Sequence, residues 1–314
     1  MENNKLQKKN KQLKDKTTGQ NVEAAKAILV TGYYNIFHEV NYQFLLDEKK
    51  WVKVKKFPES PENVHVYGVF EISNVIYVVR GNGILTLSNE VHKLPSNKLH
   101  YWCGSCKVEN KILVIRKVFE SLEGDESILF DAVNKQWSLL NIETGRVEFD
   151  VVHYLNKIWI VGGRDDEDDE SDEYEDFNIF NTIQIYDLVN RKLSLSPVKM
   201  LQARYGHKVI VYKKKLFVFG GCNTRYSFSN CVEMYSPDAN KFLMLAPMKN
   251  ARRDFGCCRV GNLVYVFGGK ISQNCCTDSV EIYNLDKNTW FDGTKLPFHT
   301  DVLQACAVSN KLEF

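Results

Sequence analysis

The chain has 314 residues, of which 44% are hydrophobic and 25% are charged, a composition that excludes a wholly disordered protein. Its formal net charge is +2, and it contains no run of the roughly 18 apolar residues that a membrane-spanning helix needs. Its nine cysteines are irregularly spaced and no secretory signal precedes them, which argues against a secreted disulfide scaffold. We therefore expect reduced thiols in a cytoplasmic protein.

The N-terminal segment, residues 1–26, is rich in lysine and lacks any apolar periodicity. We expect a disordered basic arm here, and we favour a solvated end over the alternative of a nucleic-acid-binding tail. From residue 27 to residue 314 the sequence changes to short runs of Val, Ile, Phe and Tyr separated by turn-forming residues. This pattern predicts a domain made of β-strands with hardly any helix.

Apolar hexapeptides recur along the second half of the chain and end in paired glycines: IWIVGG (residues 158–163), LFVFGG (216–221) and VYVFGG (264–269). A second motif follows, an aromatic residue with a bulky residue seven positions later: Tyr186 with Leu193, Tyr235 with Phe242, and Tyr283 with Trp290, and earlier Phe44 with Trp51 and Phe130 with Trp137. A third motif, Met-x-x-x-Arg, leads into the next unit at Met200 with Arg204 and at Met248 with Arg252. Such periods of nearly fifty residues indicate a repeat architecture.

These motifs resemble the kelch repeat, strongly over residues 158–310 and more weakly before, where IYVVRG (76–81) and AILVTG (27–32) keep one glycine and ILVIRK (112–117) keeps none. Each unit would supply a four-stranded sheet that is apolar on both faces, and sheets stacked radially bury one another. Second strands are expected near six residues: Ile28, Ile76, Ile112, Ile158, Leu216 and Val264. We therefore predict an all-β, six-bladed kelch β-propeller over residues 27–314, in which the C-terminal strand (302–310) completes the first blade.

Several segments resemble catalytic or metal-binding motifs, and we favour a structural interpretation of each. Cys103 and Cys106 in WCGSC have the spacing of a redox site, but a turn and a strand follow them instead of a helix. Adjacent cysteines in a strand point to opposite faces, so we expect Cys257-Cys258 to be packed on an inner strand, and Cys275-Cys276 to lie in an exposed loop. His207 is expected to pack near the channel. We predict no enzymatic activity, no metal and no cofactor, and the alternative is a propeller enzyme acting on a small molecule through loop residues.

An acidic insert, residues 164–180, interrupts the repeat, and its run of like charges predicts a disordered loop. It lacks the glycine turn of a calcium-binding loop. Its ten carboxylates are Asp165, Asp166, Glu167, Asp168, Asp169, Glu170, Asp172, Glu173, Glu175 and Asp176. We expect a solvated insertion, with the hypothesis that its carboxylates compete with a ligand. Of the 39 acidic residues, 29 lie outside this run and face 41 basic ones, a balance of +12.

In an up-and-down sheet, alternate connections lie at the same edge, so the segments after the paired glycines and those leading into each blade share one face. Arginine and aromatic residues, typical of protein-binding hot spots, occur in these segments. Arginine also suits acidic peptides. We expect a ligand-binding rim made of Arg204, Tyr205, Arg225, Tyr226, Arg252, Arg253, Asp254 and Lys270.

The chain resembles the C-terminal propeller of BTB–BACK–kelch adaptor proteins, whose BTB–BACK region recruits cullin-3 while the propeller holds a substrate for ubiquitination. The resemblance implies an acidic or polar peptide at the propeller mouth, with Arg204, Arg252 and Arg253 as the residues to test first. Only 26 residues precede the propeller, too few for BTB and BACK domains, so cullin-3 is expected only if that region is present elsewhere. We expect a monomer that binds a protein or peptide, with no nucleic acid and no membrane as partner. The alternative is a free-standing kelch scaffold that binds actin or cytoskeletal proteins.

Overall fold

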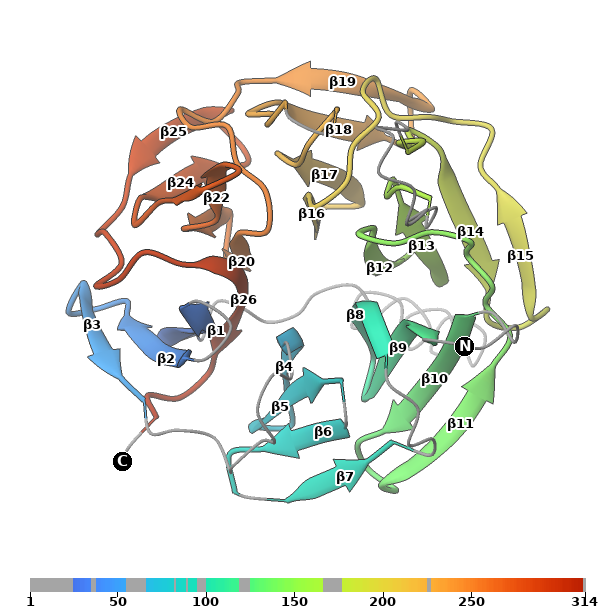
Figure 1. The fold of residues 1–314 in the computed structure, drawn as a ribbon, viewed down its shortest axis with the longest axis horizontal. Helices are drawn as coiled ribbons and strands as arrows, with labels where there is room; N and C mark the ends of the chain where they lie inside the picture. The colour runs from blue at the N-terminus through green and yellow to red at the C-terminus, as the bar shows by residue number, and fades with distance from the viewer. Residues whose placement is uncertain are drawn as a thin grey trace, which may run out of the picture.

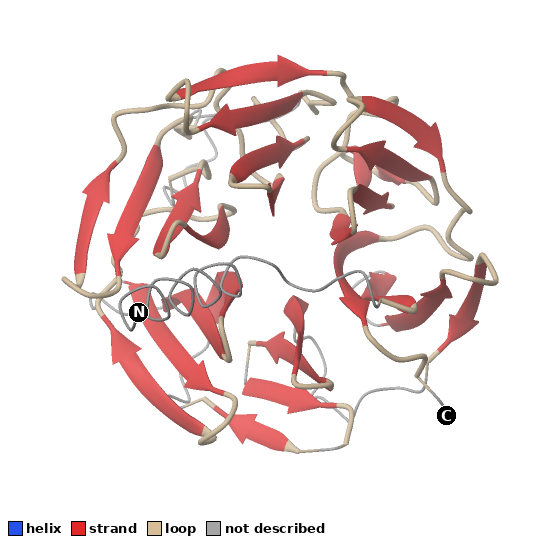
Figure 2. Ribbon diagram, turned by 180° about the vertical axis from the view of Figure 1, so that it is seen from behind, coloured by secondary structure: helices blue, strands red, loops and turns tan. Residues whose placement is uncertain are grey.

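Strands account for the regular secondary structure in the part of the chain that the computed structural model describes, namely residues 25–34, 38–54, 66–81, 83–88, 90–94, 100–118, 125–165, 177–224 and 227–312. Six four-stranded sheets are arranged radially around a central axis (Figure 1), and the view from behind shows the same ring (Figure 2). The domain is a six-bladed β-propeller, as the repeated motifs predict. None of the described segments forms a helix long and apolar enough to cross a membrane.

We number the blades from the N-terminus, and each meanders outward from its innermost strand. Blade 1 consists of β26 (Asp301–Val308), β1 (Ala27–Tyr34), β2 (His38–Leu45) and β3 (Lys50–Lys53). Blade 2 consists of β4 (Val66–Ile72), β5 (Val75–Arg80), β6 (Gly83–Thr86) and β7 (Val91–Lys93). Blade 3 consists of β8 (His100–Val108), β9 (Lys111–Val118), β10 (Asp125–Asp131) and β11 (Gln136–Leu140).

The second half of the chain forms the three blades that carry the paired glycines. Blade 4 consists of β12 (Asp150–Tyr154), β13 (Lys157–Val161), β14 (Ile183–Asp187) and β15 (Lys192–Leu195). Blade 5 consists of β16 (Lys208–Tyr212), β17 (Lys215–Phe219), β18 (Val232–Ser236) and β19 (Lys241–Leu245). Blade 6 consists of β20 (Gly256–Val260), β21 (Leu263–Phe267), β24 (Val280–Asn284) and β25 (Thr289–Asp292), and it carries a hairpin of β22 (Lys270–Ser272) and β23 (Cys275–Cys276).

The ring closes as predicted, because the C-terminal strand β26 pairs with β1 and completes the first blade. The six expected second strands are also confirmed: they are β1, β5, β9, β13, β17 and β21. The segment WCGSC lies in β8, a strand, as expected from the residues that follow it. Each of these outcomes follows from a repeat in which one supersecondary unit is used six times.

The seven-residue offset corresponds to direct cross-strand pairs between the third and fourth strands. Tyr283 lies opposite Trp290, and their ring centroids are 4.7 Å apart; Phe130 lies opposite Trp137 at 4.9 Å. Aromatic pairs of this kind stabilise a sheet beyond the apolar area that they bury. They belong to the apolar clusters that fill the spaces between neighbouring blades.

The paired glycines are required by both backbone conformation and space, as predicted. Gly220 and Gly221 have φ angles of +59° and +95°, a region that side chains disfavour. A Cβ on Gly221 would lie 2.6 Å from the carbonyl oxygen of Tyr205, which belongs to the segment leading into the same blade. The second strands of blades 4 to 6, which carry the paired glycines, therefore need glycine at these two positions.

The propeller has two different faces, set by the antiparallel order of the strands. We call the face with the connections between blades and between second and third strands the loop face. We call the opposite face the turn face, because it carries the tight turns between first and second strands and between third and fourth strands. This geometry brings the described members of the expected rim, residues 204, 205, 252–254 and 270, to the loop face.

Candidate functional site

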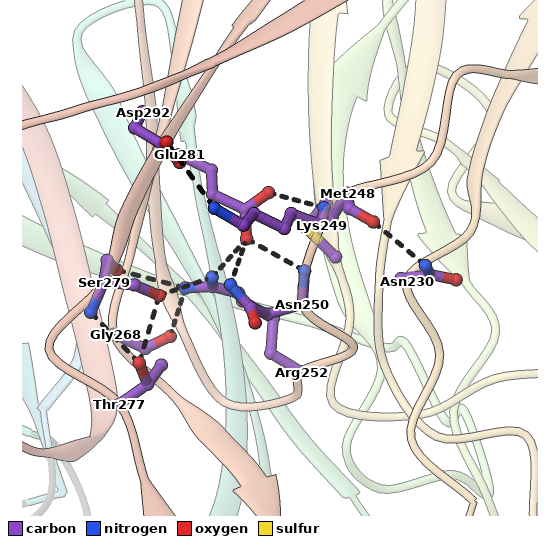
Figure 3. Close-up of polar contacts among 10 residues, drawn as sticks. All are labelled: Asn230, Met248, Lys249, Asn250, Arg252, Gly268, Thr277, Ser279, Glu281 and Asp292. Carbon is purple, nitrogen blue, oxygen red and sulfur yellow. Dashed lines mark hydrogen bonds and ion pairs between the residues drawn. The ribbon is translucent and has the colours of Figure 1, made fainter.

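A buried arginine lies in the segment leading into each of blades 4, 5 and 6. Arg146, Arg204 and Arg252 each donate from Nη1 to the carbonyl oxygen of the glycine sixteen residues later, at 3.1, 2.8 and 2.7 Å. Figure 3 shows Arg252 between Gly268, Ser279 and Glu281. The guanidinium group thus closes the end of its own blade at the point where the second strand stops.

Buried glutamates complete this arrangement in blades 5 and 6. Arg204 pairs with Glu233, and Arg252 Nη2 lies 2.5 Å from Glu281 Oε1. The same carboxylates accept hydrogen bonds from backbone N–H groups of the lead-in segment, at Leu201 (2.6 Å) and Lys249 (2.7 Å). Burial lowers the pKa of Arg252, because the desolvated cation is disfavoured.

Two of the expected rim residues are therefore not on the rim. Arg204 and Arg252 are fully buried, with exposed fractions of 0%, and their guanidinium groups are engaged by backbone carbonyls and a glutamate. The prediction that they contact a ligand is wrong. A buried arginine paired within its own blade maintains the fold instead.

Blade 4 satisfies its arginine without a carboxylate. Arg146 donates to the carbonyl and hydroxyl oxygens of Thr182, at 3.0 and 2.6 Å, and its guanidinium carbon lies 4.2 Å from the ring centroid of Phe180. Gln184 stands where blades 5 and 6 have glutamate, and it donates to the carbonyl oxygen of Thr144. Burial lowers the pKa of Arg146 to about 10.

Among the described arginines of the expected rim, Arg253, next to a buried arginine, is the one that the loop face presents to solvent. Its side chain is 22% exposed. The guanidinium carbon lies 5.4 Å from the ring centroid of Tyr205 and 5.8 Å from that of Phe228, so two aromatic side chains support it. Opposite charges in the same site keep this group cationic, and Asp254 and Glu148 raise its pKa.

Glu148 sits between two arginines and links blades 4 and 6. Its carboxylate lies 3.0 Å from Arg164 Nε and 3.4 Å from Arg253 Nη1. Burial and the charge of Asp254 raise the pKa of Glu148 above its ordinary value, against the effect of the arginines. The carboxylate and the two guanidinium groups form one charged cluster at the loop face.

Gly206 makes this cluster possible because it lies between Glu148 and Asp254 in the ring of lead-in segments. Its N–H donates to the carbonyl oxygen of Glu148, and its own carbonyl accepts from Asp254 N–H, both at 3.0 Å. A Cβ on Gly206 would approach Asp254 Oδ1 to 3.0 Å and Arg253 Cβ to 3.3 Å. The absence of a side chain lets Arg253 of blade 6 reach across blade 5 to blade 4.

The ends of the acidic insert lie beside the same cluster. Asp165 accepts two hydrogen bonds from Asn178, which closes the base of the insert. Phe177 packs against Tyr205, with ring centroids 5.5 Å apart, and it stacks on Arg164 at 4.8 Å. The other nine acidic residues, and the predicted rim residues Arg225 and Tyr226, lie outside the described residues.

The remaining predicted rim residues all lie on the loop face. Tyr205 is 3% exposed and burial raises its pKa, so its ring supports Arg253 and offers little surface of its own. Asp254 is half-buried beside Arg253, with its carboxylate 3.4 Å from Arg253 Nε. Lys270 forms an isolated antiparallel β-bridge with Arg253 through backbone hydrogen bonds. Their role in ligand binding stays a prediction.

Comparison with known proteins agrees with this architecture. The family model described as the KLHDC2/KLHL20/DRC7 Kelch-repeats domain matches residues 96–309. The chain belongs to this kelch-repeat family. Among solved structures, the one titled "Structure of YjhT" superposes with a TM-score of 0.55 at 13% identity, covering 65% of this chain and 68% of that one, which supports the fold alone.

Curated relatives of this kelch protein match it over part of their length. Kelch-like protein 15 from Mus musculus is 34% identical over 116 residues, which are 34% of this chain and 19% of that protein. Kelch-like protein 40 from Mus musculus is 25% identical over 211 residues, 65% of this chain and 32% of that protein. Kelch repeat and BTB domain-containing protein 12 from Homo sapiens is 31% identical over 126 residues, 34% of this chain and 20% of that protein. The chain thus spans a third or less of the length of these relatives.

The sequence did not predict four residues at the loop face. Glu148 and Arg164 belong to the charged cluster, and Phe177 and Phe228 lie against its arginines. A usable signal existed for their neighbourhood. Ile142 and Arg146 have the spacing of Met200 and Arg204, and Arg146 precedes Gly162 by the same sixteen residues as in the next two blades. Aligning this third lead-in segment with the other two places Glu148 two residues after its arginine, at the position that Gly206 and Asp254 occupy in blades 5 and 6. The alignment would therefore have predicted Glu148 at the loop face.

The inner strands of the kelch propeller carry polar groups that link blades. Lys208 Nζ donates to Gln304 Oε1 at 3.2 Å, and Asp150 accepts from Val209 N–H at 2.6 Å. His207 is buried as expected, and burial holds its pKa well below 6.5. Among the described residues, no three His, Cys, Asp or Glu side chains gather as a metal site would require.

The cysteines with described side chains are free thiols. Cys258 packs in the cluster between blades 6 and 1, and Cys257 packs against the cluster between blades 5 and 6, on opposite faces of β20 as predicted. Burial raises the pKa of Cys106, which makes its thiolate unfavourable. Cys275 is exposed as expected, but Cys275 and Cys276 form strand β23 of a hairpin where a loop was predicted. The side chain of Cys103 lies outside the described residues.

Proposed function

We propose that this kelch propeller is a non-enzymatic protein-binding module, and that its loop face over blades 4 to 6 binds an acidic segment of a partner. The observation that carries the proposal is the partly exposed Arg253, supported by Tyr205 and Phe228. Arginine and aromatic side chains are enriched at binding hot spots. A guanidinium group recognises a carboxylate through two parallel hydrogen bonds.

The cluster around Arg253 is organised before any ligand arrives. Glu148 and Asp254 fix the guanidinium group, and the backbone bonds through Gly206 fix the segments that carry all three residues. A side chain held in place loses less conformational entropy on binding. A ligand carboxylate therefore has to compete with Glu148 for Arg253, which favours a segment that brings more than one negative charge.

We further propose that the module recognises substrates in the cytoplasm for a ubiquitin ligase, with cullin-3 engaged where a BTB–BACK region accompanies the propeller. The name of one relative, Kelch repeat and BTB domain-containing protein 12, joins kelch repeats to a BTB domain, which supports this proposal. A scaffold that binds actin is the second outcome that the experiment distinguishes.

The test is affinity purification with wild-type protein, with Arg253→Glu and with Arg191→Glu as a matched control on the turn face. We expect Arg253→Glu to reduce capture of the principal partner about 30-fold, the effect of a hot-spot residue worth about 2 kcal/mol. Arg191→Glu should leave that capture unchanged. Equal capture by all three proteins would show that the loop-face cluster is not the binding site.

Two readouts on the same samples separate the candidate partners. Immunoblotting for cullin-3 reports on the ligase role, and co-sedimentation with filamentous actin reports on the scaffold role. Pelleting with actin that is lost in Arg253→Glu would favour the scaffold. Capture that weakens as salt is raised is expected for a site built on an exposed charge.

A further inference from the structure

The turns of blades 3 to 5 lie side by side on the turn face, where Leu188 of blade 4 packs against the apolar cluster that contains Val108 of blade 3. Contacts join these turns: Lys157 pairs with Asp187 at 3.2 Å within blade 4, and the Tyr154 hydroxyl donates to the carbonyl oxygen of Lys214 in blade 5 at 2.6 Å. The turns of blade 3 are joined in the same way by Lys111 and Asp131 at 3.3 Å. Side chains at these turns therefore share one surface.

Apolar side chains stand at the tips of the turns in blades 3 and 4. The exposed fractions are 65% for Val133, 50% for Leu155 and 88% for Val189. Val133 and Val189 occupy equivalent positions, two residues after Asp131 and Asp187, whose carboxylates accept the backbone N–H groups of these tips at 2.9 Å. The tips are thus held outward by the turns themselves.

Blades 5 and 6 have charged residues at these turn positions. The positions equivalent to Val133 and Val189 are Asp238 in blade 5 and Asp286 in blade 6. The position equivalent to Leu155 is Lys213 in blade 5. An exposed valine at a turn tip contributes little to the packing of its own blade, so these side chains are available for contact with another surface.

Cations surround the apolar tips. Arg191 and Lys192 lie two and three residues after Val189, Lys214 lies in a turn of blade 5, and Lys241 follows the other turn of that blade at the start of β19 (Lys241–Leu245). All four are exposed, and none of them pairs with a carboxylate among the residues that the structure describes. The basic excess of the chain is therefore present here, on the face opposite the acidic insert.

We propose that the turn face of blades 3 to 5 binds the surface of a membrane that contains anionic phospholipids. Val133, Leu155 and Val189 enter the headgroup region, while the cations contact lipid phosphates and carboxylates. Protein interfaces are depleted in lysine, and leucine and valine are under-represented at their hot spots, so this composition fits lipid better than protein. The proposal replaces the expectation that no membrane is a partner.

The test is co-sedimentation of the full chain with phosphatidylcholine vesicles, with and without phosphatidylserine. We expect binding only to the vesicles with phosphatidylserine, and weaker binding at high salt. The double variant Val133→Asp/Val189→Asp and the triple variant Arg191→Glu/Lys192→Glu/Lys214→Glu should each bind about tenfold more weakly or worse. All five side chains are exposed, so unchanged thermal unfolding is the check that the fold is intact.

Matched controls on the loop face make the result specific. Leu201→Asp changes an apolar side chain that is 54% exposed, and Lys199→Glu reverses an exposed charge. Both should bind vesicles within about twofold of wild type, and so should Arg253→Glu, because this proposal does not depend on the loop-face site. Wild-type protein that ignores phosphatidylserine, or variants that bind as wild type does, would overturn the proposal. Binding of polyglutamate that the triple variant loses and Arg253→Glu keeps, without binding of vesicles, would assign the turn face to acidic protein and would overturn it as well.

Discussion

Blades 4 to 6 and blades 1 to 3 share one strand order but close the loop-face end of the blade in different ways. In blades 5 and 6, an arginine from the lead-in segment reaches the first of two glycines and pairs with a buried glutamate. In blades 2 and 3, an arginine stands at the position of that glycine itself. Arg80 and Arg116 follow the turn residues Asn74 and Asn110 by the same six residues that separate Asn156 from Gly162, and both are buried.

Blade 1 uses neither device. Thr300 takes the position of the lead-in arginine, because its carbonyl accepts from Gly269 N–H as that of Arg252 accepts from Gly221 N–H. Inside the blade, the Thr31 hydroxyl donates to Asn41 Oδ1 at 2.6 Å. Among the described residues, every blade has a buried polar side chain near the loop-face end of its second strand. The residue that supplies this side chain varies from blade to blade. The repeat motifs are therefore regular in blades 4 to 6 and irregular in blades 1 to 3.

The largest loss of stability should come from removing one of the buried lead-in arginines of blades 5 and 6. Arg204→Ala leaves Glu233 buried without its cation, and we expect a loss of about 3 to 5 kcal/mol in the free energy of unfolding. Arg116→Ala should be less damaging by about half, because its partner Glu126 keeps a side-chain exposure of 20% and reaches water. Urea denaturation measures both. Equal losses would show that the Arg204–Glu233 and Arg116–Glu126 pairs contribute equally to the free energy of unfolding.

The second effect tests the paired glycines. Gly221→Ala combines a φ of +95° with a contact of 2.6 Å to a backbone oxygen, and we expect a loss of about 3 kcal/mol in the free energy of unfolding. Gly261→Ala is the matched control, since its φ is +59° and no atom lies within 4 Å of the added Cβ. That variant should lose about 1 kcal/mol. A similar loss in both would mean that backbone conformation, and not close approach, explains the motif.

The third effect depends on pH and concerns His207, which stands where blades 4 and 6 have Phe149 and Phe255. Burial holds the pKa of His207 well below 6.5, so the unfolded chain binds a proton below pH 6.5 that the folded chain does not. Stability is thus fully present above pH 6.5 and declines as the pH falls, by up to about 1.4 kcal/mol per unit.

His207→Phe removes this contribution. The difference in unfolding free energy between pH 7 and pH 5 should be smaller in the variant by about 1 to 2 kcal/mol, as measured by urea denaturation at each pH. An unchanged pH dependence would contradict the assignment to His207.

The smallest effect concerns the aromatic pairs. The Tyr283 hydroxyl donates to Asn288 Oδ1 at 2.5 Å, and Phe130 has no hydroxyl at the equivalent position of blade 3. Tyr283→Phe should reduce the unfolding free energy by about 1 kcal/mol, while Phe130→Tyr should gain none, because Lys135 stands where blade 6 has Asn288. A gain in Phe130→Tyr would show that blade 3 already contains an acceptor for the hydroxyl.

Much of the fold was predictable because its determinants are local and repeated. A diglycine at a strand end and a cross-strand pair seven residues apart can be read from a single unit, and three copies of that unit indicate the ring. Cys275 and Cys276 show the limit of this reasoning, because a two-stranded hairpin of this length depends on its pairing with Lys270 and Ser272 and not on propensity.

The candidate binding site was harder to predict than the fold. The rim expected from the sequence contains Arg204, Arg252 and Arg253, and the structure exposes Arg253 while it buries the other two. Glu148 was not expected there, although it joins Arg164 and Arg253. Both results depend on partners distant in sequence, since Arg204 meets Glu233 and Arg253 meets Glu148 only when the blades are in place.

By itself, the sequence determined that this chain is an all-β propeller of six blades closed by its last strand. It did so because every blade must bury two apolar faces and therefore repeats the same pattern. Only the tertiary structure decided which charges are internal and which are exposed. Whether an arginine lies in the core or at the surface depends on the carboxylates and carbonyls that other strands bring to it, and the sequence pattern is the same in both cases.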